Sequence, residues 1–265
     1  MLKIAVIGLG LIGGSILKSL SESDWEIAAI SKSSYDKAKS YTPYASDMIE
    51  DVRGADVVFV CTPMNEAKST LKRLENIVSP NCIVCDVCSL KGFLEGGYKF
   101  NYIGTHPMAG VEKSGFDASK NDLFQGAKWV ITSRNAILEE IIKFMGATPV
   151  LMNAKTHDIA AAQISHLPML ISFALFNSVK SDEAKTIAAS GFRDTTRLAM
   201  TNEVLAADML KLNKKNIDKS IDLFLEALNY LKNLKDDERI EVLKNISQRR
   251  ALMYDKKGKN KFTPQ

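Results

Sequence analysis

The chain has 265 residues, 46% of them hydrophobic and 25% charged, a composition typical of a soluble globular protein with one large domain or two ordinary ones. Its net charge of +4 does not indicate a nucleic-acid-binding surface: four lysines lie in the last ten residues, and the remaining Lys and Arg equal the 31 Asp and Glu. The first predicted strand begins at residue 3 and we find no apolar run of about 18 residues, so we expect neither a signal peptide nor a membrane span and predict a cytoplasmic protein.

The N-terminal stretch predicts a strand, a tight turn and a helix. Lys3–Ile7 is apolar enough for a buried strand, and Gly8, Gly10 and Gly13 follow at the G-x-G-x-x-G spacing, with helical apolar spacing after them. In this context the glycines let backbone N–H groups approach a pyrophosphate at the start of the helix. We therefore predict a dinucleotide site; the alternative is a glycine-rich turn that binds nothing.

The second predicted strand, Glu26–Ile30, ends where nicotinamide enzymes distinguish their two cofactors. An acidic residue there binds the ribose 2′-hydroxyl of NAD, whereas this chain has three serines and a lysine at 31–34, which suit the 2′-phosphate of NADP. We favour NADP over NAD; the alternative is that Asp36 reaches back to the ribose. The residues that we assign to the cofactor are Gly8, Gly10, Leu11, Ile12, Gly13, Ser31, Lys32, Cys61 and Thr62.

Strands and helices alternate as far as residue 151, which predicts an α/β fold with a doubly wound, mostly parallel sheet. The further strands that we predict are Val57–Cys61, Ile83–Val87, Tyr102–Thr105, Trp129–Thr132 and Thr148–Leu151. From residue 155 to 254 only helical apolar spacing is found. The predicted organisation is a dinucleotide-binding domain at 1–152, an all-α domain at 153–255 and a basic disordered tail at 256–265.

The four cysteines, Cys61, Cys82, Cys85 and Cys88, superficially resemble an iron–sulfur spacing. Residues three apart on a strand point to opposite faces, so we interpret them as small core residues and predict no metal site.

Two polar residues follow predicted strands at the sheet edge where ligands bind in open α/β folds. His106 is placed to accept a proton while hydride leaves a substrate, and Ser89 to orient its imidazole; the alternative for His106 is a purely structural role. In the helical region, His166 precedes Pro168, which breaks or kinks a helix, and is either a core or a cleft residue.

Arg193 and Arg197 lie one helical turn apart. Either arginine can bind a carboxylate, or pair with Asp194, or be solvated. His157 and the adjacent Asp158 show no metal partner at a workable spacing.

Three strings, GTHPMAG (104–110), ISHLPM (164–169) and SGFRDTTRLA (190–199), together resemble the prephenate/arogenate dehydrogenase family of tyrosine biosynthesis. The glycine turn and DVCSLK (86–91) fit it too, and the resemblance spans about residues 1–255. It implies an N-terminal Rossmann domain, a C-terminal helical domain that forms a homodimer, and oxidative decarboxylation of prephenate or arogenate with NAD(P).

The resemblance also implies residue roles. His106 corresponds to the base that takes the C4-hydroxyl proton, and Ser89 to the serine that hydrogen-bonds this histidine and the substrate. Arg197 corresponds to the arginine that binds a substrate carboxylate, and His166 to a histidine lining the substrate pocket.

Two departures from the family pattern bear on the choice between prephenate and arogenate. Val111 stands where a threonine is frequent, and Met169 where many members have a second histidine. The alternatives to this family are another Rossmann-plus-helical dehydrogenase or imine reductase, and a dinucleotide-sensing protein without turnover. No partner other than the small-molecule substrate and a second copy of the chain is expected.

Overall fold

The computed structural model describes residues 1–111, 113–254 and 260, which form two compact units, Met1–Ile217 and Asp218–Gln265. The domain boundary predicted at 152/153 falls inside the first unit and stays a prediction. Apart from Asn260, the tail predicted at 256–265 lies outside the described residues.

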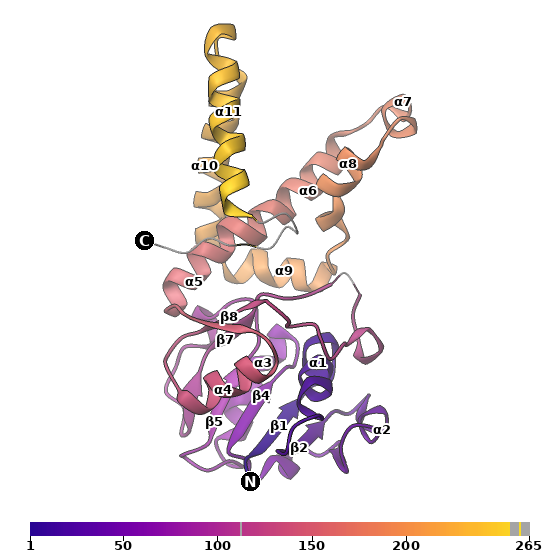
Figure 1. Ribbon diagram of the computed structural model, residues 1–265, viewed down its shortest axis with the longest axis vertical. Helices are drawn as coiled ribbons and strands as arrows, with labels where there is room; N and C mark the ends of the chain where they lie inside the picture. Colours follow the sequence, from indigo (N-terminus) through magenta and orange to yellow (C-terminus); the bar gives the residue numbers. More distant parts are fainter. Residues whose placement is uncertain (112, 255–259, 261–265) are drawn as a thin grey trace. The chain divides into compact units, whose positions relative to one another are not determined.

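The first unit contains a six-stranded, fully parallel sheet (Figure 1). Its strands are β1 (Lys3–Ile7), β2 (Glu26–Ile30), β3 (Tyr44–Ser46), β4 (Val57–Val60), β5 (Ile83–Asp86) and β6 (Asn101–Ile103). Their order, β3-β2-β1-β4-β5-β6, is that of a dinucleotide-binding Rossmann sheet, so the predicted fold class is confirmed. The short edge strand β3 was not predicted from the sequence.

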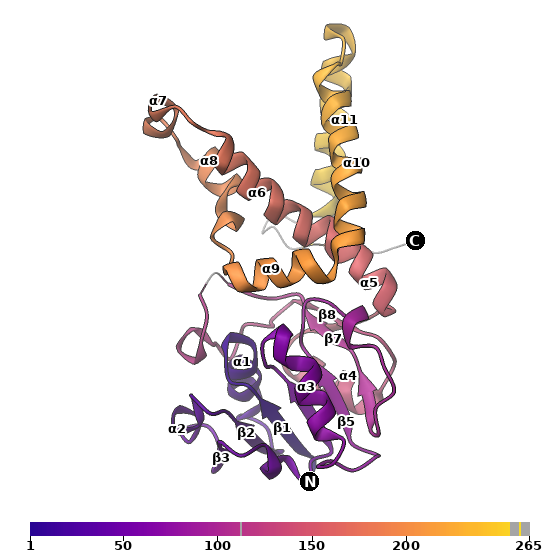
Figure 2. The same cartoon turned by 180° about the vertical axis from the view of Figure 1, so that it is seen from behind.

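Both faces of this sheet are covered, which is why its central strands are apolar throughout. One core cluster joins Ile4 and Val6 of β1 to α1 (Leu11–Leu20) and α4 (Ala136–Phe144). The other joins Ala5 and Ile7 to α3 (Met64–Leu74), together with buried residues of α6 (Leu167–Ser178) and α9 (Glu203–Leu212). Figure 2 shows the sheet from the side opposite to that of Figure 1.

A second, three-stranded sheet follows, in the order β7-β8-β9. Its strands are β7 (Thr105–Pro107), β8 (Lys128–Ile131) and β9 (Thr148–Leu151), with β7 antiparallel to β8. The single strand predicted at 102–105 is therefore wrong. At Gly104 the chain leaves the main sheet, because its N–H and C=O both bond to Thr132, at 2.9 Å each. His106 thus lies within β7, opposite Val130, and not in a loop.

From residue 153 to 254 the described chain contains only helices, as predicted, and the predicted distortion before Pro168 is a π-helical turn. A proline cannot donate the backbone bond expected of its position, and the wider turn accommodates this loss. The remaining helices of the first unit are α2 (Tyr35–Ala38), α5 (Ala154–Ala161), α7 (Asp182–Thr186) and α8 (Ser190–Thr195), with short turns η1 (Ile49–Val52), η2 (Gly92–Leu94), η3 (Phe116–Ala118), η4 (Ala162–His166) and η5 (Arg197–Met200).

The continuous helical stretch 154–178 is long and apolar enough to cross a membrane by length and composition, so the sequence-based expectation that no such stretch exists is wrong. It nevertheless carries the buried side chains of His157 and His166, which hydrogen-bond to other polar groups of the first unit. Burying ionisable groups in lipid is costly, so length and composition alone are weak evidence that this stretch crosses a membrane.

The second unit consists of the larger part of α10 (Lys214–Lys232) and α11 (Asp236–Met253). Considered alone, it exposes many large apolar side chains. Those exposed by 44% or more are Leu223, Leu225, Leu228, Tyr230, Ile240, Leu243, Ile246 and Leu252.

The four cysteines are free thiols, and Cys82, Cys85 and Cys88 are buried, as interpreted from the sequence, whereas Cys61 is only partly buried. Cys85 belongs to the core cluster with α1, and Cys82 and Cys88 belong to the cluster with α3. Strand alternation therefore separates Cys82 from Cys85, as argued above.

Candidate active site

The glycine turn has the shape that a dinucleotide requires. Gly8 has a positive φ of 88°, and a Cβ at Gly13 would lie 1.9 Å from the Gly8 carbonyl oxygen, so neither position admits a side chain. Open space surrounds Gly10, and α1 begins after it without a side-chain cap. The N–H groups of Leu11 and Ile12, ahead of the first helical hydrogen bond at Gly14, are therefore available to a pyrophosphate.

A second polar group supports this fit at the end of β4. Cys61 lies against the glycine turn, close to Gly8 and Gly13. The hydroxyl of the next residue, Thr62, is buried without a hydrogen-bond partner among the described residues. A buried hydroxyl without a partner is costly, so a bound polar ligand here would be stabilised.

The end of β2 carries hydroxyls and a cation, as the sequence indicates. Ser31 is buried and its hydroxyl accepts a bond from the Ser34 N–H at 3.2 Å, whereas Lys32 is exposed. Asp36, the alternative ribose partner, is paired with Lys39 at 2.7 Å, and both side chains are solvent-exposed. The first carboxylate after β2 therefore already has a cationic partner.

A buried ion pair, not found from the sequence, lies at the end of β5. Lys91 is 1% exposed and its ammonium group bonds to the carboxylate of Asp86 and to the Thr105 carbonyl. Asp86 also accepts bonds from the Tyr102 hydroxyl and the Cys88 N–H, each at 2.8 Å. The Lys91 ammonium is thereby fixed at the carbonyl of Thr105, the residue that precedes His106 in the chain.

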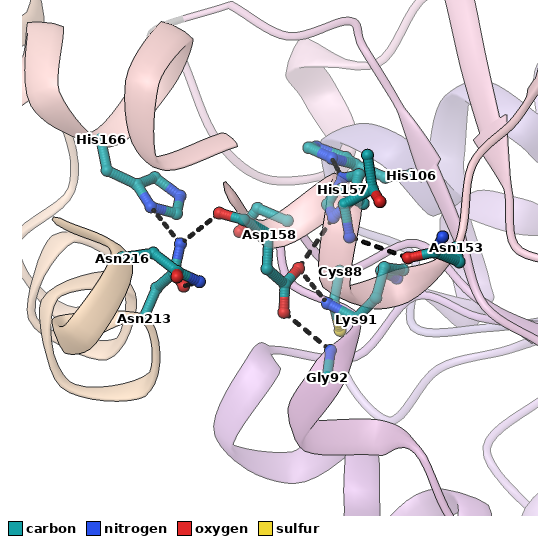
Figure 3. A network of polar contacts seen from close by, with 12 residues as sticks. Cys88, Lys91, Gly92, His106, Asn153, His157, Asp158, His166, Asn213 and Asn216 are labelled. Carbon is teal, nitrogen blue, oxygen red and sulfur yellow. Dashed lines mark hydrogen bonds and ion pairs between the residues drawn. The ribbon is translucent and has the colours of Figure 1, made fainter. Parts of the chain in front are cut away.

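His106 is linked to helix α5 by a chain of hydrogen bonds (Figure 3). Its Nδ1 lies 2.9 Å from Nε2 of His157, and Nδ1 of His157 lies 2.8 Å from the Asp158 carboxylate. That carboxylate accepts the backbone N–H groups of Lys91 and Gly92 at 2.9 and 2.8 Å. Residues from a strand, a helix and a turn are joined in this way.

Ser89 occupies a different position from the one interpreted from sequence. Its hydroxyl faces the sulfur of Met64 at 4.0 Å, while His157 occupies Nδ1 of His106. The interpretation that Ser89 orients this imidazole therefore differs from the described geometry, in which His157 does so. The predicted contact of Ser89 with a substrate stays a prediction.

Burial and charge keep the His106 ring neutral. Desolvation, the nearby Lys91 ammonium and the other two histidines hold the pKa of His106 well below its usual value. For Asp158, burial acts to raise the pKa, but the bonds from His157 and from two backbone N–H groups outweigh it and the pKa is lowered. The chain of bonds thus runs from an anionic carboxylate to a neutral imidazole.

His166 lies on the other side of Asp158 (Figure 3). It is fully buried, and Nδ1 accepts a bond from the Asn213 amide at 3.2 Å, while the same amide donates to the Asp158 carbonyl. Nε2 of His166 is buried without a partner among the described residues. Burial lowers the pKa of His166 to about 4, so the neutral ring carries its proton on Nε2 as an unused donor.

The two arginines differ in their surroundings. Arg193 is exposed and pairs with Asp194 at 2.9 Å, which is one of the alternatives considered from sequence. Arg197 is exposed at the start of η5, directly after the buried Thr196. Its predicted contact with a substrate carboxylate stays a prediction.

Sequence reasoning missed Lys91, Asp86, His157 and Asp158 as members of one polar site. Lys91 lies 15 residues from His106 and His157 lies 51 residues from it, so no local spacing links them. Two signals were available: DVCSLK (86–91), which contains Asp86 and Lys91, fits the family pattern, and His157 is one of three histidines and is followed by an acid.

A Rossmann sheet with a glycine turn shaped for a dinucleotide, together with a neutral, partly exposed imidazole in the same unit, defines a nicotinamide-dependent dehydrogenase. Models of the two domains of one family match the chain: "prephenate dehydrogenase, nucleotide-binding domain" at 27–155 and "prephenate dehydrogenase, dimerization domain" at 153–248. The chain belongs to the prephenate dehydrogenase family, as its motifs indicate, and is an oxidoreductase that uses NAD(P).

Named relatives extend over most of the chain. It is 29% identical to the prephenate dehydrogenase of Lactococcus lactis subsp. cremoris, covering 94% of this chain and 73% of that protein. The structure of prephenate dehydrogenase from A. aeolicus in complex with hydroxyphenyl propionate and NAD+ superposes with a TM-score of 0.84 at 28% identity, covering 94% and 97%. That of Synechocystis arogenate dehydrogenase gives 0.79 at 30% identity, with the same coverage.

Proposed function

We propose that the protein catalyses the oxidative decarboxylation of prephenate to 4-hydroxyphenylpyruvate in tyrosine biosynthesis. The observation that carries this proposal is His106, a neutral, partly exposed imidazole whose Nδ1 is engaged by His157, so that Nε2 remains as a base. Family membership supplies the reaction class.

The residues of the chain position groups and handle one proton. The glycine turn and Thr62 would hold NAD(P)+, which would supply the acceptor for the hydride that leaves C4 of the ring. His106 Nε2 accepts the proton of the C4 hydroxyl as the C4–O double bond forms. The bond from C1 to its carboxylate then breaks, CO2 departs, and the electron pair completes the aromatic ring. His106 returns its proton to the phenolate oxygen, so the protein gains no net proton.

Three further residues are proposed to hold the substrate. Arg197 binds a carboxylate through a charge-assisted pair, as the family resemblance implies. His166 offers its unused Nε2–H to an acceptor of the substrate, which would remove the cost of a buried donor without a partner. Ser89 is proposed to donate to the C4 oxygen.

We favour NADP as the cofactor. The hydroxyls of Ser31, Ser33 and Ser34 and the charge of Lys32 suit a 2′-phosphate, and Asp36 is already paired with Lys39. The wild type should therefore have the higher kcat/KM with NADP, and Ser31→Asp with Lys32→Ala should reverse the preference by about 1.5 to 3 decades, or roughly 2–4 kcal/mol. A wild type that prefers NAD would contradict this choice.

The alternative substrate is arogenate, the amino acid that corresponds to the keto acid prephenate. Similarity to the Synechocystis arogenate dehydrogenase favours it, and Met169, at a position that distinguishes members, is a buried core residue here. Comparing kcat/KM for prephenate and arogenate with both cofactors, while identifying 4-hydroxyphenylpyruvate or tyrosine, tests the proposal. Turnover of arogenate alone would replace it, and turnover of neither would refute both.

The second unit is proposed to form a homodimer in the cytoplasm. The model described as a dimerization domain matches residues 153–248, which include the larger part of the second unit. In addition, α10 and α11 expose a series of large apolar side chains that a second copy would cover. Light scattering should give twice the mass of the 29.2-kDa chain. A monomer at micromolar concentration would contradict this assignment.

A further inference from the structure

We propose that His157 and Asp158 are positioning residues that hold the proton of His106 on Nδ1 and thereby leave its Nε2 bare as the base. The inference rests on the proposed role of His106. It assigns roles to two residues that no motif identified.

The chain of bonds begins at Asp158. Its carboxylate oxygens receive three donors: the N–H groups of Lys91 and Gly92, and Nδ1 of His157. An ionised carboxylate only accepts, so all three contacts are satisfied when Asp158 is charged. The pKa of Asp158 is lowered, which maintains this state at neutral pH.

The next link is the tautomer of His157. Because Asp158 accepts from Nδ1, a neutral His157 carries its proton there, and its Nε2 is left with a lone pair. His157 is 3% exposed and its ring meets that of His106 edge-on, at 76°. Rotation out of this arrangement would break both hydrogen bonds at once.

The lone pair of His157 then determines the proton on His106. Nδ1 of His106 lies 2.9 Å from Nε2 of His157, so it must be the donor of that bond. The neutral His106 ring has one proton, and its Nε2 is consequently free to accept another. When it does so, the Nδ1–H···Nε2 bond to His157, with Asp158 behind it, stabilises the imidazolium.

The surroundings of His106 make this support necessary. Burial and the nearby Lys91 ammonium both disfavour a positively charged His106, and the bond to His157 offsets part of that cost.

Two substitutions at His157 separate positioning from packing. In His157→Asn the amide occupies the place of Nδ1 and can still bond Asp158, but nothing reaches His106. In His157→Gln the longer side chain can present an oxygen at the place of Nε2 and accept from His106. Thr156→Ala, on the exposed neighbouring residue of α5, is the matched control.

We expect His157→Asn to lower kcat about 10- to 100-fold with little change in KM, and His157→Gln to recover most of the loss. The acid limb of kcat/KM should move to lower pH in His157→Asn, because His106 loses the acceptor that stabilises its protonated form. Thr156→Ala should match the wild type. These variants are compared with His106→Asn, using full-length protein, prephenate and either cofactor.

The outcomes distinguish this inference from the proposed function. If His106→Asn is inactive while His157→Asn keeps the wild-type kcat and pH profile, His106 remains the base and the positioning role is wrong. If both His157 variants lose activity and thermal stability equally, the residue acts through packing alone and the inference is again wrong. If His106→Asn retains full turnover, the proposed base itself is wrong.

Discussion

Two buried polar clusters flank His106, and they differ in whether the protein satisfies them. Around Asp86, both carboxylate oxygens have partners, including Lys91, Tyr102 and backbone N–H groups. Around Asp158 the hydrogen-bond chain ends at Nε2 of His106, and the neighbouring His166 has a buried nitrogen with no partner among the described residues.

The difference indicates that one cluster stabilises the fold and the other binds a ligand. A satisfied cluster fixes structure, because removing any member leaves another buried group without a partner. A cluster whose ring nitrogens have no partner remains available to a ligand. The free-energy cost of leaving such a nitrogen unpaired is offset when a substrate binds to it. Four substitutions or titrations probe this comparison.

The largest expected effect is on catalysis, at His106, where the hydrogen-bond chain from Asp158 ends. His106→Asn should lower kcat by about 10²- to 10⁴-fold with a much smaller change in KM, because proton transfer is lost while substrate contacts remain. Steady-state kinetics with prephenate measure this. Near-normal kcat would exclude His106 as the base.

Breaking the satisfied cluster should act on stability. Lys91→Met leaves the Asp86 charge buried and should lower the free energy of unfolding by about 3–5 kcal/mol, measured by urea denaturation. Lys143→Met, at an exposed position of α4, is the control and should change it little. Similar values for the two variants would mean that the buried pair is not structural.

The unpartnered His166 should make stability depend on pH. Its pKa is lowered from 6.5 to about 4, so between these values the unfolded chain binds more protons than the folded one. Stability is therefore fully present above pH 6.5 and is lost as pH falls toward 4, by about 3 kcal/mol. His166→Gln should lack this contribution in denaturation curves recorded across that range. An unchanged pH dependence would contradict the assignment.

The smallest effect is expected at the exposed arginines. Arg197→Ala should raise KM for the substrate by roughly one to two decades through loss of one charge-assisted pair, and leave KM for the cofactor unchanged. Arg193→Ala, whose side chain pairs with Asp194, should do less. Equal effects of the two changes would rule out a specific role for Arg197.

The parts of the fold that could be predicted from the sequence are those determined by residues close together in the chain. The strand Lys3–Ile7 and the glycine turn follow from apolar run and backbone sterics within about ten residues, and both are found as predicted. The all-α character beyond residue 153 follows from periodicity in the same way.

The assembled site could not be predicted in this manner. The sequence predicts His106 just after a strand that ends at Thr105, whereas the residue lies within β7, because the switch of sheets at Gly104 depends on Thr132, far along the chain. The sequence suggests Ser89 as the residue that orients its imidazole, whereas the structure shows His157 hydrogen-bonded to it. His157 lies 51 residues further along the chain, near the start of α5. Tertiary contacts between distant segments decide both, and neither leaves a periodic signal.

The proton positions that make His106 a base can be measured as the tautomeric state of the three histidines, read from ¹⁵N resonances of the imidazole rings in the full-length protein at neutral pH. Three rings make each assignable through His106→Asn, His157→Gln and His166→Gln. We expect the proton on Nδ1 in His106 and His157 and on Nε2 in His166, with the His106 proton redistributed in His157→Asn. A His106 ring that carries its proton on Nε2 in the wild type would contradict this expectation.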